Sequence, residues 1–208
     1  ALAITEHGYM FGAVEVYNAC KDVGIKPIIG CELYTAPTTI YEKSAATKSC
    51  GHIVLLSKTT AGYHNLLKLA SIAATDGLYY KPRIDMDLLK KYHEGIICLS
   101  ACLQGDIPAK LLAGDKEGAY AKAQELKDIF GEDFYIELQY HGLEDQKKVL
   151  FPLIQLAKAL DIQLVATNDV HYVEKKDAFA QRVLMCMSMG KTCLLYTSDA
   201  ADERSSVD

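Results

Sequence analysis

The sequence predicts an α/β domain in which strands and helices alternate along nearly the whole chain. Two observations carry this prediction. Short apolar runs of strand length recur along the sequence, and segments with apolar residues at helical spacing lie between them. Such alternation favours a parallel sheet with helical crossovers. At 208 residues and 50% hydrophobic composition, we expect one domain, either an open sheet or most of a barrel.

The individual elements follow from the same patterns. Six strands are expected, at residues 1–5, 27–32, 52–57, 95–102, 133–138 and 163–167. Helices are expected at residues 11–23, 61–74, 116–130, 143–160 and 177–189. The first helix should stop at Gly24, because Pro27 follows it closely. The stretch 38–51 has neither pattern and is expected to be a disordered loop.

Composition excludes several classes of protein. A net charge of −5 gives no basic field that would bind nucleic acid by charge alone. No apolar run approaches the roughly 20 residues of a membrane span, and no signal segment opens the chain. Seven cysteines, an odd number without framework spacing, fit a reducing compartment. We therefore expect a cytoplasmic protein without a membrane partner.

The two ends of the sequence suggest a fragment. Ala1 already begins a buried-type strand, and no initiator methionine precedes it, so we expect the natural protein to start upstream. Residues 193–208 break the alternating pattern and resemble an in-frame translation of a transposon-library sequencing adapter. The alternative is a natural polar tail. We expect the native domain to occupy residues 1–192.

Side chains of metal-ligand type lie at or beside the ends of several expected strands. Asp169 and His171 follow the last strand two positions apart, so they point to the same side. The other candidates are His7, Glu32, His52 and Cys102. Each has a simpler alternative: a solvated loop for the Asp-x-His pair, a helix cap for His7, a surface pair with lysine for Glu32, and a core thiol for Cys102. His52 precedes its strand, so that strand either runs antiparallel or has a loop folded over the barrel mouth.

A substrate contact is expected from Lys81 and Arg83. They lie in a Tyr-Tyr-Lys-Pro-Arg stretch that combines aromatic faces with positive charge, which suits a single-stranded nucleic acid end. The alternative is a proline-bearing loop that packs its tyrosines on the barrel. Gly190-Lys191-Thr192 is not a phosphate-binding loop, because Met185 stands where that motif needs glycine. His141 is expected to be an ordinary surface residue.

Several motifs, in order, resemble one known family. They are the opening Ala-Leu-Ala-Ile-Thr-Glu-His-Gly, Gly24-Ile-Lys-Pro-Ile-Ile-Gly-Cys-Glu-Leu-Tyr, His52-Ile-Val-Leu-Leu, Tyr79-Tyr-Lys-Pro-Arg-Ile-Asp, Leu99-Ser-Ala-Cys-Leu, Glu137-Leu-Gln and Val165-Ala-Thr-Asn-Asp-Val-His-Tyr. From residue 1 to about residue 192, the chain resembles the PHP domain at the N-terminus of bacterial DNA polymerase III alpha subunits. The resemblance implies a distorted seven-stranded α/β barrel whose first strand lies upstream of Ala1.

The resemblance also implies a metal site. His7, Glu32, His52, Cys102, Asp169 and His171 match metal-ligand positions of the family. This donor set suits up to three zinc or manganese ions, and the thiolate favours zinc. His7, Glu32, Asp169 and His171 would take part in catalysis. A His-x-His motif and an acidic ligand of the family precede Ala1, so we expect weak metal binding here, with Glu6 tuning the site from outside the ligand set.

The implied function is that of part of a replicative DNA polymerase. The parent chain would extend primers with magnesium in a separate polymerase domain. This domain would be a metal-dependent 3′–5′ proofreading exonuclease that acts on the primer 3′ end, or a structural remnant that docks a proofreading subunit or other holoenzyme subunits. The alternatives are a free-standing phosphatase such as histidinol phosphatase and a binding module without chemistry.

Overall fold

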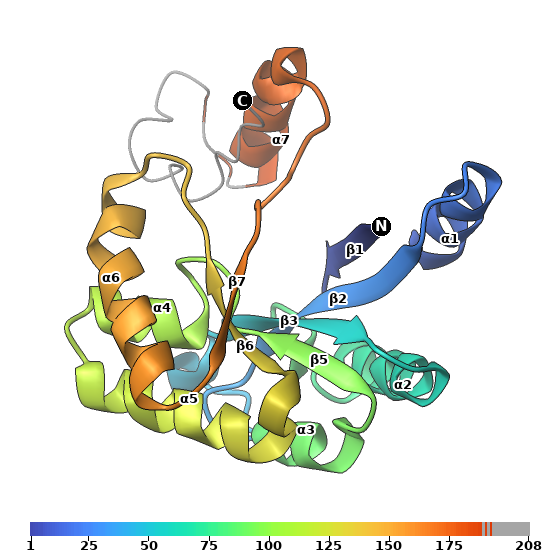
Figure 1. The fold of residues 1–208 in the computed structure, drawn as a ribbon. Helices are drawn as coiled ribbons and strands as arrows, with labels where there is room; N and C mark the ends of the chain where they lie inside the picture. The colour runs from blue at the N-terminus through green and yellow to red at the C-terminus, as the bar shows by residue number, and fades with distance from the viewer. Residues whose placement is uncertain (189, 191, 193–208) are drawn as a thin grey trace.

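Seven strands form one sheet in the computed structural model, which describes residues 1–188, 190 and 192 (Figure 1). The strands are β1 (Leu2–His7), β2 (Pro27–Thr35), β3 (Gly51–Ser57), β4 (Arg83–Ile84), β5 (Ile96–Leu99), β6 (Phe134–Leu138) and β7 (Gln163–Ala166). Their order is β1-β2-β3-β5-β6-β7, and β4 pairs with β2. The predicted α/β class is confirmed. The expected tail at 193–208 lies outside the described residues.

The helices agree with the predicted segments and add two. They are α1 (Ala13–Asp22), α2 (Thr60–Thr75), α3 (Met86–Tyr92), α4 (Asp106–Leu112), α5 (Lys116–Phe130), α6 (Glu144–Ala159) and α7 (Ala178–Ser188). Three short 3-10 helices are η1 (Ala45–Thr47), η2 (Gly131–Asp133) and η3 (Lys175–Asp177). The helices α3 and α4 and the strand β4 were not predicted. None of the described helices is long and apolar enough to span a membrane.

Local side-chain chemistry fixes where several helices begin. Thr59 precedes α2, and its side chain accepts a hydrogen bond from the amide of Gly62. Asp115 does the same for α5 by accepting from the amide of Gly118. Asp85 accepts from the amide of Leu88 at the start of α3. These caps satisfy amides that have no partner within their own helix.

The sheet is mixed rather than purely parallel, which corrects the expectation of a parallel sheet. β3 runs antiparallel to both neighbours, β2 and β5, whereas the pairs β1–β2, β5–β6 and β6–β7 are parallel. This confirms the first of the two arrangements expected for His52. The start of β3 therefore lies beside the carboxyl end of β2, with His52 opposite Tyr34.

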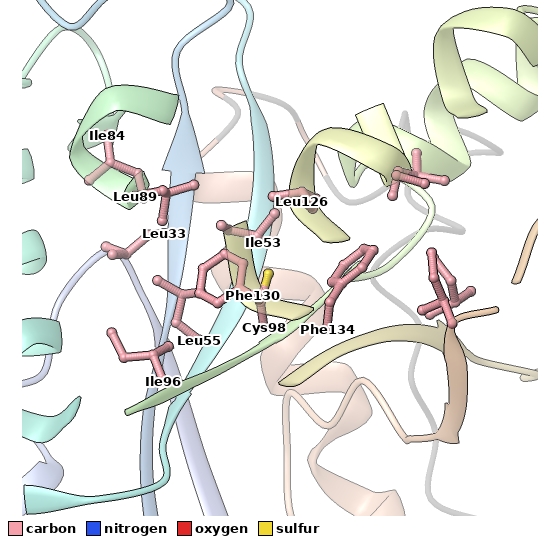
Figure 2. Close-up of a cluster of buried hydrophobic side chains, with 14 of the residues drawn as sticks. Leu33, Ile53, Leu55, Ile84, Leu89, Ile96, Cys98, Leu126, Phe130 and Phe134 are labelled. Carbon is pink, nitrogen blue, oxygen red and sulfur yellow. The ribbon is translucent and has the colours of Figure 1, made fainter. Parts of the chain in front are cut away.

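The two faces of the sheet carry different packing. Leu33, Leu55, Cys98 and Phe134 belong to the large core between the sheet and its helices, to which Leu126 of α5 also contributes (Figure 2). The alternate strand positions form a smaller cluster on the opposite face, made of Val54, Leu99 and Ala101 with Leu56, Ile97, Tyr135 and Val165 packed against it. We call this second face the inner face. Glu32 lies on it, because it stands opposite Val54 in the β2–β3 register.

The stretch 38–51, predicted to be disordered, is held in place in the structure. It contains η1, and three of its carbonyl groups, those of Ile40, Glu42 and Thr47, accept hydrogen bonds from the guanidinium of Arg83. The carboxylate of Asp85 accepts a further hydrogen bond from the backbone amide of Ile40. A loop without periodic pattern is therefore ordered by long-range polar contacts that spacing along the sequence does not reveal.

Candidate metal centre

The six predicted ligands come from both edges and the middle of the sheet. His7 ends β1 and stands opposite Glu32 of β2 in the parallel register. His52 opens β3, so the antiparallel direction of that strand brings it to the same end of the sheet. Cys102 follows β5, and Asp169 follows β7. The topology therefore gathers residues that are far apart in sequence at one end of the sheet.

On one side of this group, two of the predicted ligands flank His52. Its Nε2 atom lies 3.9 Å from Oε2 of Glu32 and 3.2 Å from the sulfur of Cys102. The other carboxylate oxygen of Glu32, Oε1, lies 3.5 Å from Nε2 of His7. Glu32 thus faces two different histidines with its two oxygens, an arrangement that a bridging carboxylate requires.

The group continues from His7, at the end of the edge strand β1, to the segment after the other edge strand, β7. We call the side between these two edges the sheet opening. The ring centroids of His7 and His171 are 5.2 Å apart. Nδ1 of His171 lies 3.0 Å from the backbone carbonyl oxygen of Asp169 and 3.9 Å from its carboxylate. The six predicted residues consequently form one unbroken series of neighbours, Cys102–His52–Glu32–His7–His171–Asp169. Their metal binding stays a prediction.

Burial sets the protonation of two members. Burial, with smaller contributions from the nearby His7 and Lys81, lowers the pKa of His52 to about 4, so its imidazole is neutral at pH 7. Burial raises the pKa of the Cys102 thiol to about 12, with a further contribution from Asp169, so the sulfur keeps its proton. A neutral imidazole is ready to bind a cation, whereas the thiol must first release a proton.

The chemistry of these donors fits a transition metal ion. Imidazole nitrogen, carboxylate oxygen and thiolate sulfur are the ligands that zinc binds in proteins. The side chains, however, meet in pairs: across the described part of the chain, no group of three or more His, Cys, Asp or Glu side chains is arranged so that it could hold an ion. Metal binding would therefore need a rearrangement that brings a third donor to a pair.

Glu6 has a local structural role. Its Oε2 accepts a hydrogen bond of 2.8 Å from the backbone amide of Gly12, at the start of α1. In the β1–β2 register it stands opposite Cys31, whose side chain belongs to the large core. The carboxylate of Glu6 thus holds the segment that connects β1 to α1.

Of the two predicted substrate residues, only Lys81 is exposed. Its Nζ lies 4.8 Å from the ring centroid of Tyr34 and 3.4 Å from the hydroxyl of that residue. Arg83 is completely buried and donates to the backbone carbonyls of four residues, including Gly77. Substrate contact by Arg83 is therefore wrong for this structure, because the core already uses its donors.

One polar residue beside the site was not selected from the sequence. Glu137 of β6 is only 5% exposed, and its carboxylate accepts from the hydroxyl of Thr167, two residues before Asp169. His141, expected at the surface, is half-buried, with Nδ1 2.9 Å from the amide nitrogen of Gln146. The sequence did contain a signal for Glu137: it is an acidic residue at an alternating position of an apolar strand, and a carboxylate buried there needs a polar partner.

Comparison with known proteins places these residues in a family context. The model of the PHP domain family matches residues 1–141. The DNA polymerase III subunit alpha of Treponema pallidum is 48% identical over 194 residues, which are 92% of this chain and 17% of that protein. The same subunit of Borreliella burgdorferi is 47% identical, with 91% and 17% covered, and that of Thermus aquaticus is 44% identical, with 92% and 16% covered.

The chain thus spans about a sixth of the length of these relatives. Among solved structures, it is similar to a protein of Bifidobacterium adolescentis described as a metal-dependent phosphoesterase. That similarity has a TM-score of 0.41 and 11% identity, and it covers 82% of this chain and 77% of the other.

Proposed function

Because this chain belongs to the PHP domain family, we propose that it is the PHP domain of a DNA polymerase III alpha subunit and removes nucleotides from primer 3′ ends in a metal-dependent reaction. The observation that carries the proposal is the unbroken series of six donor side chains at one end of the sheet. A structural scaffold would have no need to bring imidazoles, carboxylates and a thiol together from five separate strands.

Each member of the series has a role in the proposal. His7, Glu32, His52, Cys102, Asp169 and His171 would hold divalent cations, zinc or manganese, up to three in a complete site. Bound there, such ions activate water and stabilise charge on a phosphodiester. Of the six, His7, Glu32, Asp169 and His171 would also act in catalysis on the scissile phosphate. Glu32 keeps two histidines oriented through its two oxygens.

Lys81 would contact the substrate. Its ammonium lies over the ring of Tyr34, the residue opposite His52, and is therefore at the border of the site. One exposed cation beside an aromatic ring suits the phosphate and the terminal base of a single strand. Because the net charge of the whole chain is −5, this contact would have to be local.

The proposal extends to the parent protein. Relatives that are about six times longer make a polymerase chain the natural setting, with the PHP domain at residues 1–192 and a non-native tail after it. In that setting the protein is cytoplasmic, uses magnesium in its polymerase domain, and contacts DNA and other holoenzyme subunits, including a separate proofreading subunit.

One observation favours a second candidate, a PHP domain that has lost its chemistry. The donors contact one another in pairs, and within the described residues no three of them are arranged to hold an ion. In this case the series would stabilise the sheet opening, and proofreading would belong to another subunit.

Excision assays on the full-length polymerase chain separate the two candidates. Purified protein is supplied with Mn²⁺ or Zn²⁺ and a primer with a mismatched 3′ end, without nucleotides. We expect excision in the unaltered protein and a loss of about 100-fold or more in Asp169→Asn, with primer extension retained. The control is Asp161→Asn, which removes an exposed carboxylate before β7 and should change neither rate.

If the unaltered chain excises no faster than Asp169→Asn, the exonuclease proposal is wrong and the structural candidate takes its place. If Asp161→Asn loses excision together with Asp169→Asn, the loss is not specific to this site and does not support the proposal.

A further inference from the structure

The unsatisfied polar atoms of the described residues gather at one place. The buried side-chain atoms without a hydrogen-bond partner there are Oε2 of Glu137, Oε1 of Gln139 and Nε2 of His141. All three belong to five consecutive residues at the end of β6. Because buried polar groups are almost always hydrogen-bonded, such a concentration calls for a partner that the protein itself does not supply.

Glu137 is the member best placed to face the candidate metal centre. It stands opposite Val165 in the β6–β7 register, and Val165 packs on the inner face of the sheet. Tyr135, two residues earlier on the same strand, packs there as well, so alternation puts the Glu137 side chain on the inner face. The backbone amide of Glu137 is held by the hydroxyl of Ser100, one residue after β5.

The strand order puts Glu137 between two predicted ligands. Cys102 follows β5, Glu137 lies in β6, and Asp169 follows β7, and these three strands are neighbours in the sheet. The hydroxyl that donates to the Glu137 carboxylate belongs to Thr167, two residues before Asp169, so the chain itself links the two carboxylates. The six predicted ligands leave β6 without a contribution, and Glu137 fills that gap.

The two oxygens of Glu137 have different surroundings. Oε1 accepts from the hydroxyl of Thr167 and, at 3.3 Å, from the amide nitrogen of Gln139. Oε2 is buried without a partner, in a side chain that is 5% exposed. The hydrogen bonds on Oε1 fix the orientation of the carboxylate. Oε2 makes no hydrogen bond of normal geometry, and the backbone amide of Ala101 lies near the carboxylate. A carboxylate held by one oxygen and open at the other is typical of a cation ligand supported by neighbouring groups.

We propose that Glu137 is a further divalent-cation ligand of this centre, supplying Oε2 from β6 between the sites of Cys102 and Asp169. The inference rests on the proposed function, since it assigns an additional residue to the same metal centre. It explains why a carboxylate is buried with an unsatisfied oxygen beside a second carboxylate, an arrangement that is costly unless a cation is bound.

His141 does not share this role. The side-chain oxygen of Gln146 accepts from the backbone amide of His141 at 2.7 Å, so its amide nitrogen faces Nδ1 of the same residue at 2.9 Å. Nδ1 is therefore the acceptor, and Nε2 carries the hydrogen. A protonated ring nitrogen donates a hydrogen bond and does not bind a metal ion, so the proposal is confined to Glu137.

A structural role for Glu137 makes a different prediction, which the choice of variants exploits. If the residue only fastens Thr167, then Thr167→Val should act like Glu137→Gln. If Glu137 binds a cation, Glu137→Gln should weaken binding more than Thr167→Val, because the latter keeps the carboxylate. Glu94→Gln is the matched control, since it removes an exposed carboxylate before β5, at the end of that strand opposite to Cys102.

The test measures Zn²⁺ binding to the full-length polymerase chain by competition with a chromophoric chelator, with thermal unfolding of each metal-free variant as a check on folding. We expect Glu137→Gln to raise the Zn²⁺ dissociation constant about 10- to 100-fold and Glu94→Gln to leave it unchanged. The double variant Glu137→Gln/Asp169→Asn should lose less than the sum of the two single losses in binding free energy, because both residues would act on the same ion.

Two results would overturn the inference in distinguishable ways. If Glu137→Gln binds Zn²⁺ as the unaltered chain does while Asp169→Asn is impaired, the metal centre exists and Glu137 is not part of it. If the unaltered chain binds Zn²⁺ no more tightly than Asp169→Asn does, the proposed function fails, and this inference fails with it.

Discussion

The guanidinium of Arg83 is a positive charge placed entirely inside the protein. It donates to the carbonyl oxygens of Gly77, Thr47, Ile40 and Glu42 at 3.0 to 3.4 Å, and it lies 5.1 Å from the ring of Tyr79. Only a side chain with several N–H donors, such as the guanidinium of arginine, can reach all four carbonyls at once. Arg83 thus holds three carbonyls of the 38–51 stretch, while Asp85 holds one of its amides.

Replacing Arg83 by lysine should destabilise the chain although the charge is kept. A single ammonium cannot reach all of these carbonyls, so at least one is left buried without a partner, and we expect a loss of about 2–4 kcal/mol. Urea unfolding measures this loss, and limited proteolysis should show faster cleavage within 38–51. Lys81→Gln serves as the control, because Lys81 is exposed and its loss should cost under about 0.5 kcal/mol. Equal stability of the two variants would contradict the structural role of Arg83.

Residue types alone could not separate Arg83 from Lys81. Both stand in one Tyr-Tyr-Lys-Pro-Arg stretch, and only the fold shows that one enters the core while the other faces solvent. For Glu137 the difficulty was the reverse. A glutamate at one position of an apolar strand is common when that face of the strand is exposed. The role of Glu137 appears only once the structure shows that its side chain is buried and which strands flank β6.

At the scale of elements, long periodic segments were predicted well and short ones were missed. The segment predicted at 116–130 is α5 without change, because caps and periodicity agree over 15 residues. The helices α3 and α4 have only 7 residues each, too few for a helical period to stand out. The direction of β3 was left open for a physical reason: an apolar run has the same composition in either direction, and only its connections decide.

One of the missed elements, α4, is tied to the sheet by a titratable contact. The hydroxyl of Thr35, at the end of β2, donates to the carboxylate of Asp106 at 2.8 Å. Burial raises the pKa of Asp106 above its usual 3.8, and the hydrogen bond from Thr35 opposes that shift only in part. The folded state therefore binds a proton at Asp106 more readily than the unfolded state does.

This contact gives a pH dependence of known sign. Since the folded pKa is raised, the contribution of Asp106 to stability is greatest below pH 3.8 and is lost as the pH rises through the raised pKa. Asp106→Asn cannot ionise and lacks this dependence. The stability of the variant relative to the unaltered chain should thus increase as the pH rises from 3 to 7. Urea unfolding at several pH values measures it, and a constant difference would show that Asp106 has no raised pKa.

At the scale of the whole molecule, the described sheet has two ends, β1 and β7, and the candidate centre lies between them. Both strands are largely exposed, yet the rings of His7 and His171 are 5.2 Å apart. The sheet therefore curves far enough to bring the end of its first strand to the segment after its last one, as a distorted barrel requires. The expectation of six strands in this chain was one too low, because β4 has only 2 residues.

A cation bound at this centre should hold the two ends of the sheet together. His7 lies on one side of the opening and Asp169 on the other, so an ion shared by these sides restricts their separation. At a Zn²⁺ concentration of about 100 times the dissociation constant, binding adds about 2.7 kcal/mol to stability. Local unfolding events that break the site should become about 100-fold rarer. The amides of β1 and β7 should therefore exchange about 100-fold more slowly with deuterated solvent. Mass spectrometry measures this, and a chelator should reverse it.

Residues 54–56 of the central strand β3, beyond the predicted ligand His52, are the internal reference for this experiment. Their amides lie in a segment paired on both sides, with β2 and β5, so Zn²⁺ should slow their exchange much less. Asp169→Asn should abolish the effect at β1 even though the residue follows β7, because the two edges would be coupled only through the ion. Slower exchange of β7 with no change at β1 would mean that the cation binds beside Asp169 alone and that the opening is not closed by metal.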